Sequence, residues 1–182
     1  ETSQCRSELH CHLKGLKIKI EDKAIGVLDR FGGHQGAALM LKEVPELNWS
    51  LLKEKAVSKI LLLDGIEDPH NLGAILRTGW LMGVDAVLLP QDRSVGLSPG
   101  VHKVACGGAE HVPVEICGNF ANTLEELKKI GYWVFGLSHL GKKSIFDLKL
   151  PEKIVWAIGS EEKGLRVTTE RQCDELVYIP QA

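Results

Sequence analysis

An asparagine and an arginine stand close together in the segment DGIEDPHNLGAILRTG, which follows a short apolar run. Asp68-Pro69 is typical of a turn, and Asn71 falls where a helix would begin. Arg77 follows six residues later, less than two helical turns away. An amide and a guanidinium near the end of a strand could hold a phosphate or a ribose. An ordinary capped helix with a surface arginine would show the same spacing.

Two further loops follow apolar strands, which is where open α/β sheets place their ligand sites. In IGSEEKGL, Gly159 ends a predicted strand, and Gly164 allows a tight loop whose backbone amides could face a ligand. Glu161 lies between these glycines, and a plain turn with two exposed glutamates explains the same residues. In VYIPQA, Ile179 and Pro180 leave another strand at the end of the sequence.

Other site types fit the sequence less well. Gly136 to Lys142 matches the GxxxxGK frame of a phosphate-binding loop, but Lys143 stands where a magnesium-binding serine or threonine should be. A GxGxxG dinucleotide fingerprint, a Ser-His-Asp pattern and an HExxH motif are absent from the sequence. The HCH triplet at residues 10–12 has no second ligand pair at zinc-finger spacing, so we predict no metal site.

Strand-like and helix-like segments alternate from about Ala56 onward and would position these loops. Such alternation favours an α/β domain with a mainly parallel sheet. The predicted strands are KILLLDG, DAVLL, HVPVEI, YWVFGLS, KIVWAIGS and ELVYIP, and the predicted helices are PHNLGAILRTGWLMG and ANTLEELKKIG. The first fifty-odd residues read as a strand (LKIKIED), a helix (DKAIGVLDRFGG), a second strand (HQGAALMLKEV) and a second helix (PELNWSLLKEKAV).

Composition limits the class of protein. The 182 residues are 44% hydrophobic and 25% charged, with a net charge of −2, which counts mildly against a nucleic-acid binder. Lysines cluster near the start, however, and local basic patches can serve where the total charge does not. No apolar run reaches the roughly 18–20 residues of a membrane span, and no signal peptide is evident. Five scattered cysteines indicate a reducing compartment, so we expect a cytoplasmic protein, or an organellar one in a eukaryote.

Several segments together resemble the signatures of SpoU-type (TrmH-like) RNA ribose methyltransferases. DGIEDPHNLGAILRTG is similar to D-x-x-x-D-P-x-N-x-G-A-x-x-R, and IGSEEKGL is similar to G-[NS]-E-x-x-G-[LI]. KVACGGAEHVPV resembles K-x-S-x-G-A-x-E-x-x-P-V, with Cys106 and Gly108 as departures. YIP matches the opening of the third signature, and HQGAAL resembles the junction between a small RNA-binding domain and the catalytic domain. The segments follow the family's order between Gly33 and Ala182.

The resemblance implies a mainly parallel sheet with helices on both faces and a deep trefoil knot of the SPOUT type. It also implies an obligate homodimer whose active site draws on both subunits, and S-adenosyl-L-methionine as the cofactor. The catalytic group would be Arg77, Asn71 and Glu161. The cofactor-binding residues would be Gly159, Ile179, Ser138 and Pro180. RNA would be bound by Arg77, Arg93, Lys103 and His34.

We therefore expect an RNA 2′-O-ribose methyltransferase, with residues 33–182 as its catalytic domain and residues 1–32 as the remainder of an RNA-binding domain, a linker or a tag. The HQG-like junction favours ribosomal RNA over transfer RNA as the substrate. The third signature stops at Ala182, so we expect the catalytic domain to continue beyond it. A transfer RNA ribose methyltransferase and a non-catalytic RNA-binding homologue are the alternatives, and a nucleotide hydrolase is a weaker third.

Overall fold

The computed structural model describes residues 21, 25–29, 38, 40, 41 and 43–180. The chain divides into two compact units, residues 1–42 and 43–182. The described part of the first unit includes one short helix, α2 (Ile25–Leu28). The second unit holds the sheet and the loops that follow its strands.

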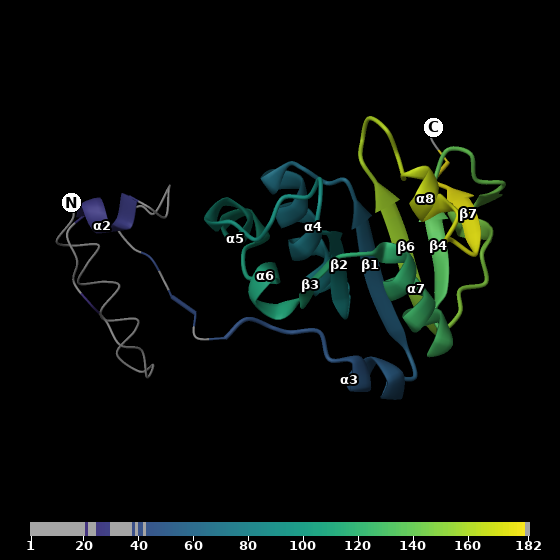
Figure 1. The fold of residues 1–182 in the computed structure, drawn as a ribbon, viewed down its shortest axis with the longest axis horizontal. Coiled ribbons are helices and arrows are strands. Elements are labelled where there is room, and N and C mark those ends of the chain that lie inside the picture. Colours follow the sequence, from purple (N-terminus) through teal and green to yellow (C-terminus); the bar gives the residue numbers. More distant parts are fainter. Residues whose placement is uncertain (1–20, 22–24, 30–37, 39, 42, 181–182) are drawn as a thin grey trace. The chain divides into compact units, whose positions relative to one another are not determined.

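A seven-stranded sheet forms the centre of the second unit (Figure 1), and every pair of neighbouring strands in it is parallel. The order across the sheet is β3-β2-β1-β6-β4-β7-β5. Parallel pairing places the carboxyl ends of all these strands at one edge. The strands are β1 (Ser58–Asp64), β2 (Ala86–Pro90), β3 (Val114–Cys117), β4 (Trp133–Leu137), β5 (Lys143–Ser144), β6 (Lys153–Gly159) and β7 (Glu175–Tyr178).

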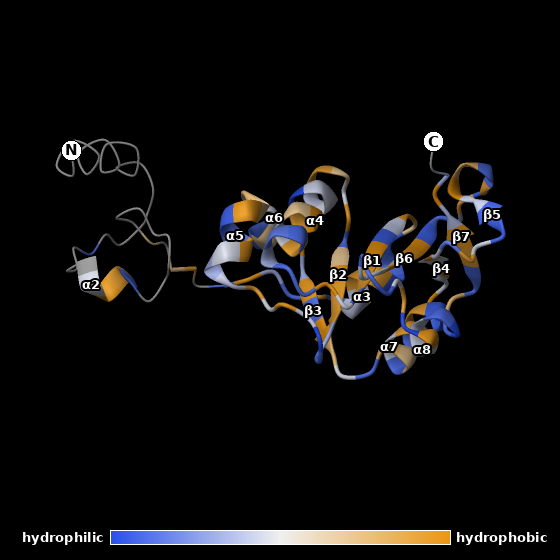
Figure 2. Cartoon of the chain, turned by 90° about the horizontal axis from the view of Figure 1, so that it is seen from above, coloured by the Kyte–Doolittle hydropathy of each residue, from blue (hydrophilic) through white to orange (hydrophobic). Residues whose placement is uncertain are grey.

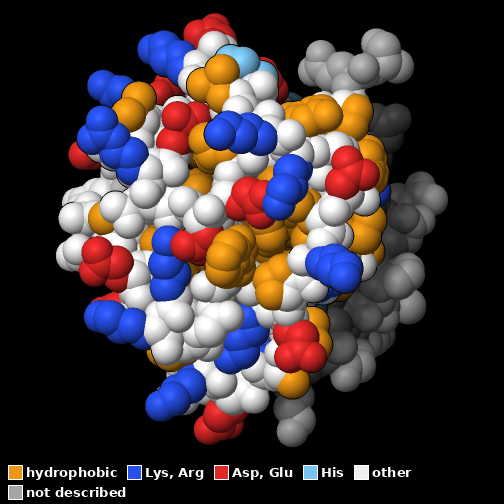
Figure 3. All heavy atoms as spheres, turned by 90° about the vertical axis from the view of Figure 1, so that its right-hand side faces the viewer, with side chains coloured by type: hydrophobic (Ala, Val, Ile, Leu, Met, Phe, Trp, Pro, Cys, Tyr) orange, Lys and Arg blue, Asp and Glu red, His pale blue; other side chains and the backbone are white. Residues whose placement is uncertain are grey.

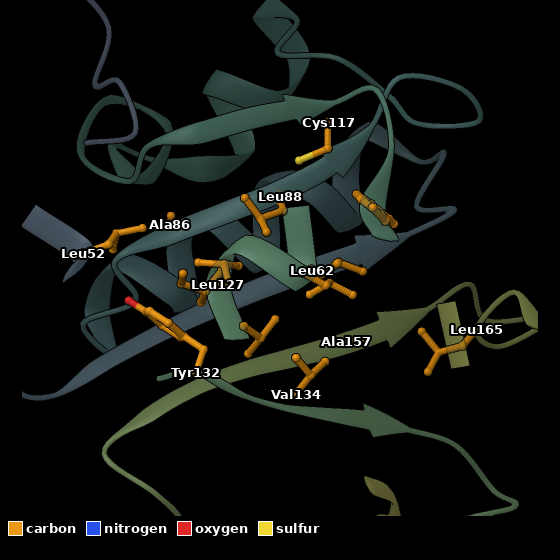
Figure 4. Close-up of a cluster of buried hydrophobic side chains, with 14 residues drawn as sticks. Leu52, Leu62, Ala86, Leu88, Cys117, Leu127, Tyr132, Val134, Ala157 and Leu165 are labelled. Atoms are coloured by element: carbon orange, nitrogen blue, oxygen red, sulfur yellow. The ribbon is translucent and has the colours of Figure 1, made fainter. Parts of the chain in front are cut away.

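Helices cover both faces of the sheet (Figure 2), because its central strands carry buried apolar side chains on both sides. Ile60 and Leu62 of β1 pack with helices α3 and α7, in the core cluster of Figure 4. Leu63, one residue further, points to the opposite face and packs with helices α4, α5 and α6. The helices are α3 (Trp49–Glu54), α4 (Pro69–Leu81), α5 (Pro99–Ala105), α6 (Gly108–His111), α7 (Phe120–Lys129) and α8 (Val167–Glu170).

The structure confirms the predicted parallel α/β architecture from β1 onward, but some local predictions were wrong. The described residues of the predicted strand HQGAALMLKEV (38, 40, 41, 43 and 44) are not in a strand. The helix predicted over PELNWSLLKEKAV is shorter, since α3 covers only Trp49–Glu54. Helix α5 was missed, although Ser98 caps it and Pro99 opens it, a common helix-start signal. The predicted strand LKIKIED lies almost wholly outside the described residues.

Hydrophobic side chains gather on the side of the unit where β7 lies (Figure 3). Exposed apolar residues near this edge are Leu140, Phe146, Leu150, Tyr178 and Ile179. Within the part of the chain that the structure describes, no helix combines the length and the apolar character that crossing a bilayer requires.

Candidate active site at the carboxyl ends of the strands

The predicted site residues lie on loops and helices that follow the strands, and these loops meet at one edge of the sheet. Gly159 at the end of β6 stands directly beside Asp64 at the end of β1, in parallel register. Strand β4 lies between β6 and β7, so the loops after these three strands are neighbours. The sheet thus brings the first, second and third sequence motifs together, although they are far apart in the chain.

Asn71 and Glu161 are in direct contact. Asp68 caps α4 by accepting a hydrogen bond from the backbone N–H of His70 (2.9 Å), and Pro69 occupies the first turn. This start places Asn71 in the first turn, facing the loop after β6. Its Nδ2 donates to Oε1 of Glu161 at 2.9 Å, across 90 residues of sequence. Two of the three predicted catalytic side chains are therefore held together by the fold.

Arg77 lies further along the same helix and is exposed. Six residues correspond to about 9 Å along the axis and place Arg77 on a different side of α4 from Asn71. Within the described part of the chain, its guanidinium makes no hydrogen bond or ion pair, to Asn71 and Glu161 or to any other residue. The structure therefore leaves this cation free for an external anion or hydroxyl.

A second link joins the same two loops, and sequence reasoning missed one of its partners. Asp64 is 1% exposed and accepts from the backbone N–H of Arg166 (3.0 Å) and from its Nε (2.5 Å). A buried carboxylate needs such partners, because desolvating an unpaired charge is costly. An aspartate that ends an apolar strand could have signalled this need, but not which arginine meets it.

Close backbone packing shapes the loops after β4 and β6. A Cβ added to Gly159 would lie 2.0 Å from the carbonyl carbon of Gly164, so only glycine fits there. Ser160 and Gly164 close this loop with two backbone hydrogen bonds. A Cβ on Gly141 would lie 2.4 Å from the carbonyl carbon of Val177, so the loop after β4 passes directly against the end of β7.

The other predicted cofactor residues lie at this same place. The backbone N–H of Ser138 donates to the carbonyl of Val177 (2.9 Å), and its hydroxyl donates to Glu170 (3.2 Å). Ile179 and Pro180 follow β7 at the same edge, and Ile179 is 55% exposed. Ser138, Gly159 and Ile179 thus occupy three adjacent loops, as an enclosing pocket would require.

The predicted RNA-binding residues are more scattered. Lys103 is exposed on α5, which packs against α4, the helix of Arg77. Arg93 is exposed in the loop after β2 and has a left-handed backbone (φ 58°). These cations are carried by the β1–β2 half of the sheet and its helices, away from Ser138 and Ile179. His34 lies outside the described residues.

The structure gives no support to the phosphate-binding loop that GLSHLGK suggests. A P-loop requires a helix after the glycines, but β4 is followed by β5 and a short 3-10 turn at Ile145–Asp147. Burial raises the pKa of the Cys117 thiol and raises that of Cys173 to about 12, so neither supplies a thiolate near neutral pH. Among the residues that the structure describes, no cluster of histidine, cysteine and acidic side chains could hold a metal ion.

Comparison with known proteins agrees with this arrangement. Residues 58–182 match the SpoU rRNA Methylase family. The chain is 50% identical over 121 residues to 23S rRNA (guanosine-2'-O-)-methyltransferase RlmB of Neisseria meningitidis, covering 66% of this chain and 48% of the relative. It is 38% identical over 175 residues to the protein of that name from Pseudomonas aeruginosa, covering 92% and 71%. The chain thus spans about half the length of the Neisseria relative.

Solved structures show the same fold. A putative RNA methyltransferase of the TrmH family from Porphyromonas gingivalis has a TM-score of 0.65 and 29% identity, over 70% of this chain and 52% of its own. The SpoU methyltransferase AviRb from Streptomyces viridochromogenes, solved with AdoMet, has a TM-score of 0.77 and 20% identity, over 93% and 67%. The family match begins at β1 and includes the loops after β1, β4, β6 and β7, so the chain belongs to the SpoU rRNA methylase family.

Proposed function

We propose that this chain carries the catalytic domain of a 2′-O-ribose methyltransferase that uses S-adenosylmethionine and acts on ribosomal RNA. Membership of the SpoU family and the named function of the RlmB relatives support the reaction and the substrate class. The observation that carries the proposal is the contact between Asn71 and Glu161, which unites the first two family motifs at one edge of the sheet.

The loops after β4, β6 and β7 are the proposed cofactor site. The loop after β6 packs closely on itself at Gly159, and the loop after β4 packs closely against the end of β7 at Gly141. Ile179 and Leu140 add exposed apolar side chains at the same edge, which suit an adenine ring, and Ser138 and Pro180 complete the rim. Bound S-adenosylmethionine would supply the methyl group from its sulfonium. The close backbone packing and the exposed apolar side chains support this group as the ligand.

The residues of this chain must position the ribose and manage the proton of its 2′-hydroxyl. An arginine side chain stays protonated at ordinary pH, so Arg77 is better suited to stabilising a developing alkoxide and bonding a phosphate than to removing the proton. Glu161 fixes the amide of Asn71, whose orientation would otherwise be free. We assign Asn71 and Glu161 to orienting the reacting groups and Arg77 to electrostatic stabilisation. Near-full turnover by Arg77→Lys would contradict a bidentate role for Arg77.

A homodimer whose active site draws on both subunits is part of the proposal. Arg77 lies on another side of α4 from the Asn71–Glu161 contact, as a residue that serves a second copy would. The exposed apolar side chains near β7 (Figure 3) are compatible with burial in an assembly. We further propose a cytoplasmic protein with a trefoil knot, and residues 1–32 as the part upstream of the catalytic domain.

The test is methyl transfer from labelled S-adenosylmethionine to 23S rRNA transcripts, with the product mapped by the resistance of 2′-O-methylated positions to alkaline cleavage. We expect turnover by the parent protein and a loss of about 10²–10³-fold in Glu161→Ala, as for removal of a preorganised polar group. Glu162→Ala is the matched control, because Glu162 is the exposed neighbour. Calorimetric titration with S-adenosylhomocysteine runs beside it.

Each outcome separates the alternatives. Binding of S-adenosylhomocysteine without methylation of any RNA would favour a non-catalytic RNA-binding homologue. Methylation of transfer RNA but not ribosomal RNA would move the substrate to the alternative class. If the parent protein bound no S-adenosylhomocysteine and methylated no RNA, the proposed function would be wrong.

A further inference from the structure

We propose that a second pocket, separate from the candidate active site, receives one unstacked nucleobase of the RNA substrate and so helps to select the methylated position. The inference rests on the proposed function. The pocket has a volume of about 260 Å³ and opens at the carboxyl ends of β2 and β3, beside the start of α7 and the segment 166–169. None of the predicted catalytic or cofactor residues lines it.

The size of the pocket restricts the ligand. Pockets for drug-sized molecules measure roughly 300–1,000 Å³, so this one suits a fragment as small as a single base. Its lining side chains include Phe120, two amides (Gln91 and Asn119) and the hydroxyl of Thr168. Phe120 is largely buried, and the guanidinium of Arg166 lies over its ring. Proteins hold unstacked bases by stacking on planar groups such as guanidinium and by bonds from amides to the base edges.

Both amides retain hydrogen-bonding capacity. The Oδ1 of Asn119 accepts from the backbone N–H of Ala121 at 2.9 Å as the cap of α7, which leaves the NH₂ group of Asn119 as a donor. Gln91 is exposed, and its Oε1 would lie 3.6 Å from a Cβ added to Gly118, another residue of the lining. One donor group and one complete amide can together read a base edge.

Arg166 provides a fixed planar group rather than a free charge. Its Nε and backbone N–H both bond the buried Asp64, and its guanidinium carbon lies 5.7 Å from the centre of the Phe120 ring. Asp64 neutralises this arginine, and the other charged residue of the lining is the acidic Asp92. Because these carboxylates offset the charge of Arg166, the pocket attracts an anionic phosphate only weakly. The planar guanidinium can still stack on a neutral base.

Two hydrogen-bonded contacts connect the pocket with the candidate active site. Asp64 and Asn71 flank one loop, and Glu161 and Arg166 flank the other. The Asn71–Glu161 and Asp64–Arg166 bonds therefore connect the same two segments. A base held against Arg166 would place the neighbouring ribose relative to Asn71 and Glu161, which is how remote binding contributes to orientation.

The test fills the pocket without changing any residue of the candidate active site. Thr168 is exposed on α8 and lines the pocket, whereas its neighbour Val167 is 62% exposed and does not line it. We expect Thr168→Trp to raise the KM for RNA roughly 10- to 100-fold, the usual contribution of one bound base. Val167→Trp should keep the parent KM, and both variants should keep the parent affinity for S-adenosylhomocysteine and the parent melting temperature.

Abasic substrates distinguish a base from a phosphate. RNAs with one base removed at each position around the methylated ribose keep every phosphate. One of them should raise the KM of the parent protein and leave that of Thr168→Trp unchanged. If Thr168→Trp matched Val167→Trp, or if its defect remained the same on every abasic RNA, the base pocket would be refuted while the methyltransferase assignment stood. The affinity of each protein for the same abasic RNAs is also measured, so that the pocket is tested even without turnover. If the parent protein showed neither turnover nor binding of S-adenosylhomocysteine, the proposed function itself would be overturned.

Discussion

The two ends of the sheet are built differently. At the amino end, Asp85 accepts hydrogen bonds from the Ser58 hydroxyl (2.7 Å) and the backbone N–H of Lys59 (2.9 Å), and it pairs with Lys55. The hydroxyl of Tyr132 donates to Ser58 at 2.6 Å, so the network joins β1, β2 and the start of β4. These polar groups satisfy one another and leave little for a ligand.

Lys153 also stabilises the amino end of the sheet, by hydrogen bonds to helix carbonyls. Its Nζ donates to the carbonyls of Leu52, Lys53 and Ile130, at 3.0, 2.9 and 3.3 Å. These carbonyls belong to the last turns of α3 and α7, which otherwise lack partners. The amino end therefore serves mainly to stabilise the fold.

At the carboxyl end, few side chains of the described residues are linked to one another by hydrogen bonds in this way. Three side-chain links, Asn71–Glu161, Asp64–Arg166 and Ser138–Glu170, hold its loops. The exposed Arg77 has no partner among the described residues. Backbone packing at Gly159 replaces side-chain contacts. Binding residues are expected on such loops, held by a rigid scaffold. The comparison predicts that substitutions at the amino end change stability, whereas most at the carboxyl end change binding or turnover.

Gly159→Ala is expected to have the largest effect on stability and to be the exception at the carboxyl end. The added Cβ would meet backbone atoms of Gly164 and Leu165 at 2.0–2.2 Å, which cannot move like a side chain. We expect a loss of about 3 kcal/mol in the free energy of unfolding, measured by urea denaturation, together with loss of S-adenosylhomocysteine binding. Gly96→Ala is the control, because open space surrounds Gly96. Equal stability of the two variants would show that the loop after β6 is not packed as described.

Asp85→Asn is expected to have the next largest effect, with a defined pH dependence. Burial alone would raise the pKa of Asp85, but hydrogen bonds from Lys55, Ser58 and Lys59 lower it below its ordinary value of 3.8. The ionised carboxylate therefore stabilises the fold above the unfolded pKa, and this contribution is lost as the pH falls through the folded pKa.

We expect Asp85→Asn to lose about 1.5 kcal/mol at pH 6, with the difference from the parent protein shrinking as the pH falls below about 4. Urea titrations at several pH values measure it. A difference that stayed constant from pH 6 to pH 3 would contradict the ionic role of Asp85.

Tyr132→Phe removes only the hydroxyl that donates to Ser58. The ring stays in the core cluster of Figure 4, so we expect a loss of about 1 kcal/mol, the usual net value of one hydrogen bond. Methyl transfer should be unchanged, because this residue lies at the opposite end of the sheet from Asn71. If turnover fell although the variant was fully folded, the amino end would also contribute to activity, and the two ends would not be functionally separate.

Asn71→Ala should have the smallest effect on stability. The contact with Glu161 is solvent-exposed, so the free energy of unfolding should change by no more than about 0.5 kcal/mol. Turnover should nevertheless fall strongly, because the ribose would lose an oriented partner. Thermal melts beside the methyl-transfer assay measure both. A variant that melted several degrees lower would assign Asn71 to the scaffold instead.

Most of the sheet could be predicted from the sequence, because apolar runs such as KILLLDG and DAVLL have few alternatives to buried parallel strands. Short elements without a strong pattern, such as β5 and α6, could not be predicted, since tertiary packing rather than local propensity stabilises them. The loops of the candidate site were found by motif resemblance. Arg166 was missed because nothing in its local sequence pairs it with Asp64, 102 residues away.

The sequence by itself determined the α/β class, the strand-end position of the motifs and the family resemblance, since these follow from local patterns of apolar residues, glycine and aspartate. Only the tertiary structure decided that Asn71 contacts Glu161 while Arg77 stands apart, and that Arg166 and Phe120 share a second pocket. Those contacts depend on the order of strands in the sheet, which brings β6 beside β1 although more than 80 residues separate them. Long-range pairing of this kind depends on how the whole chain packs, which no local stretch of residues encodes.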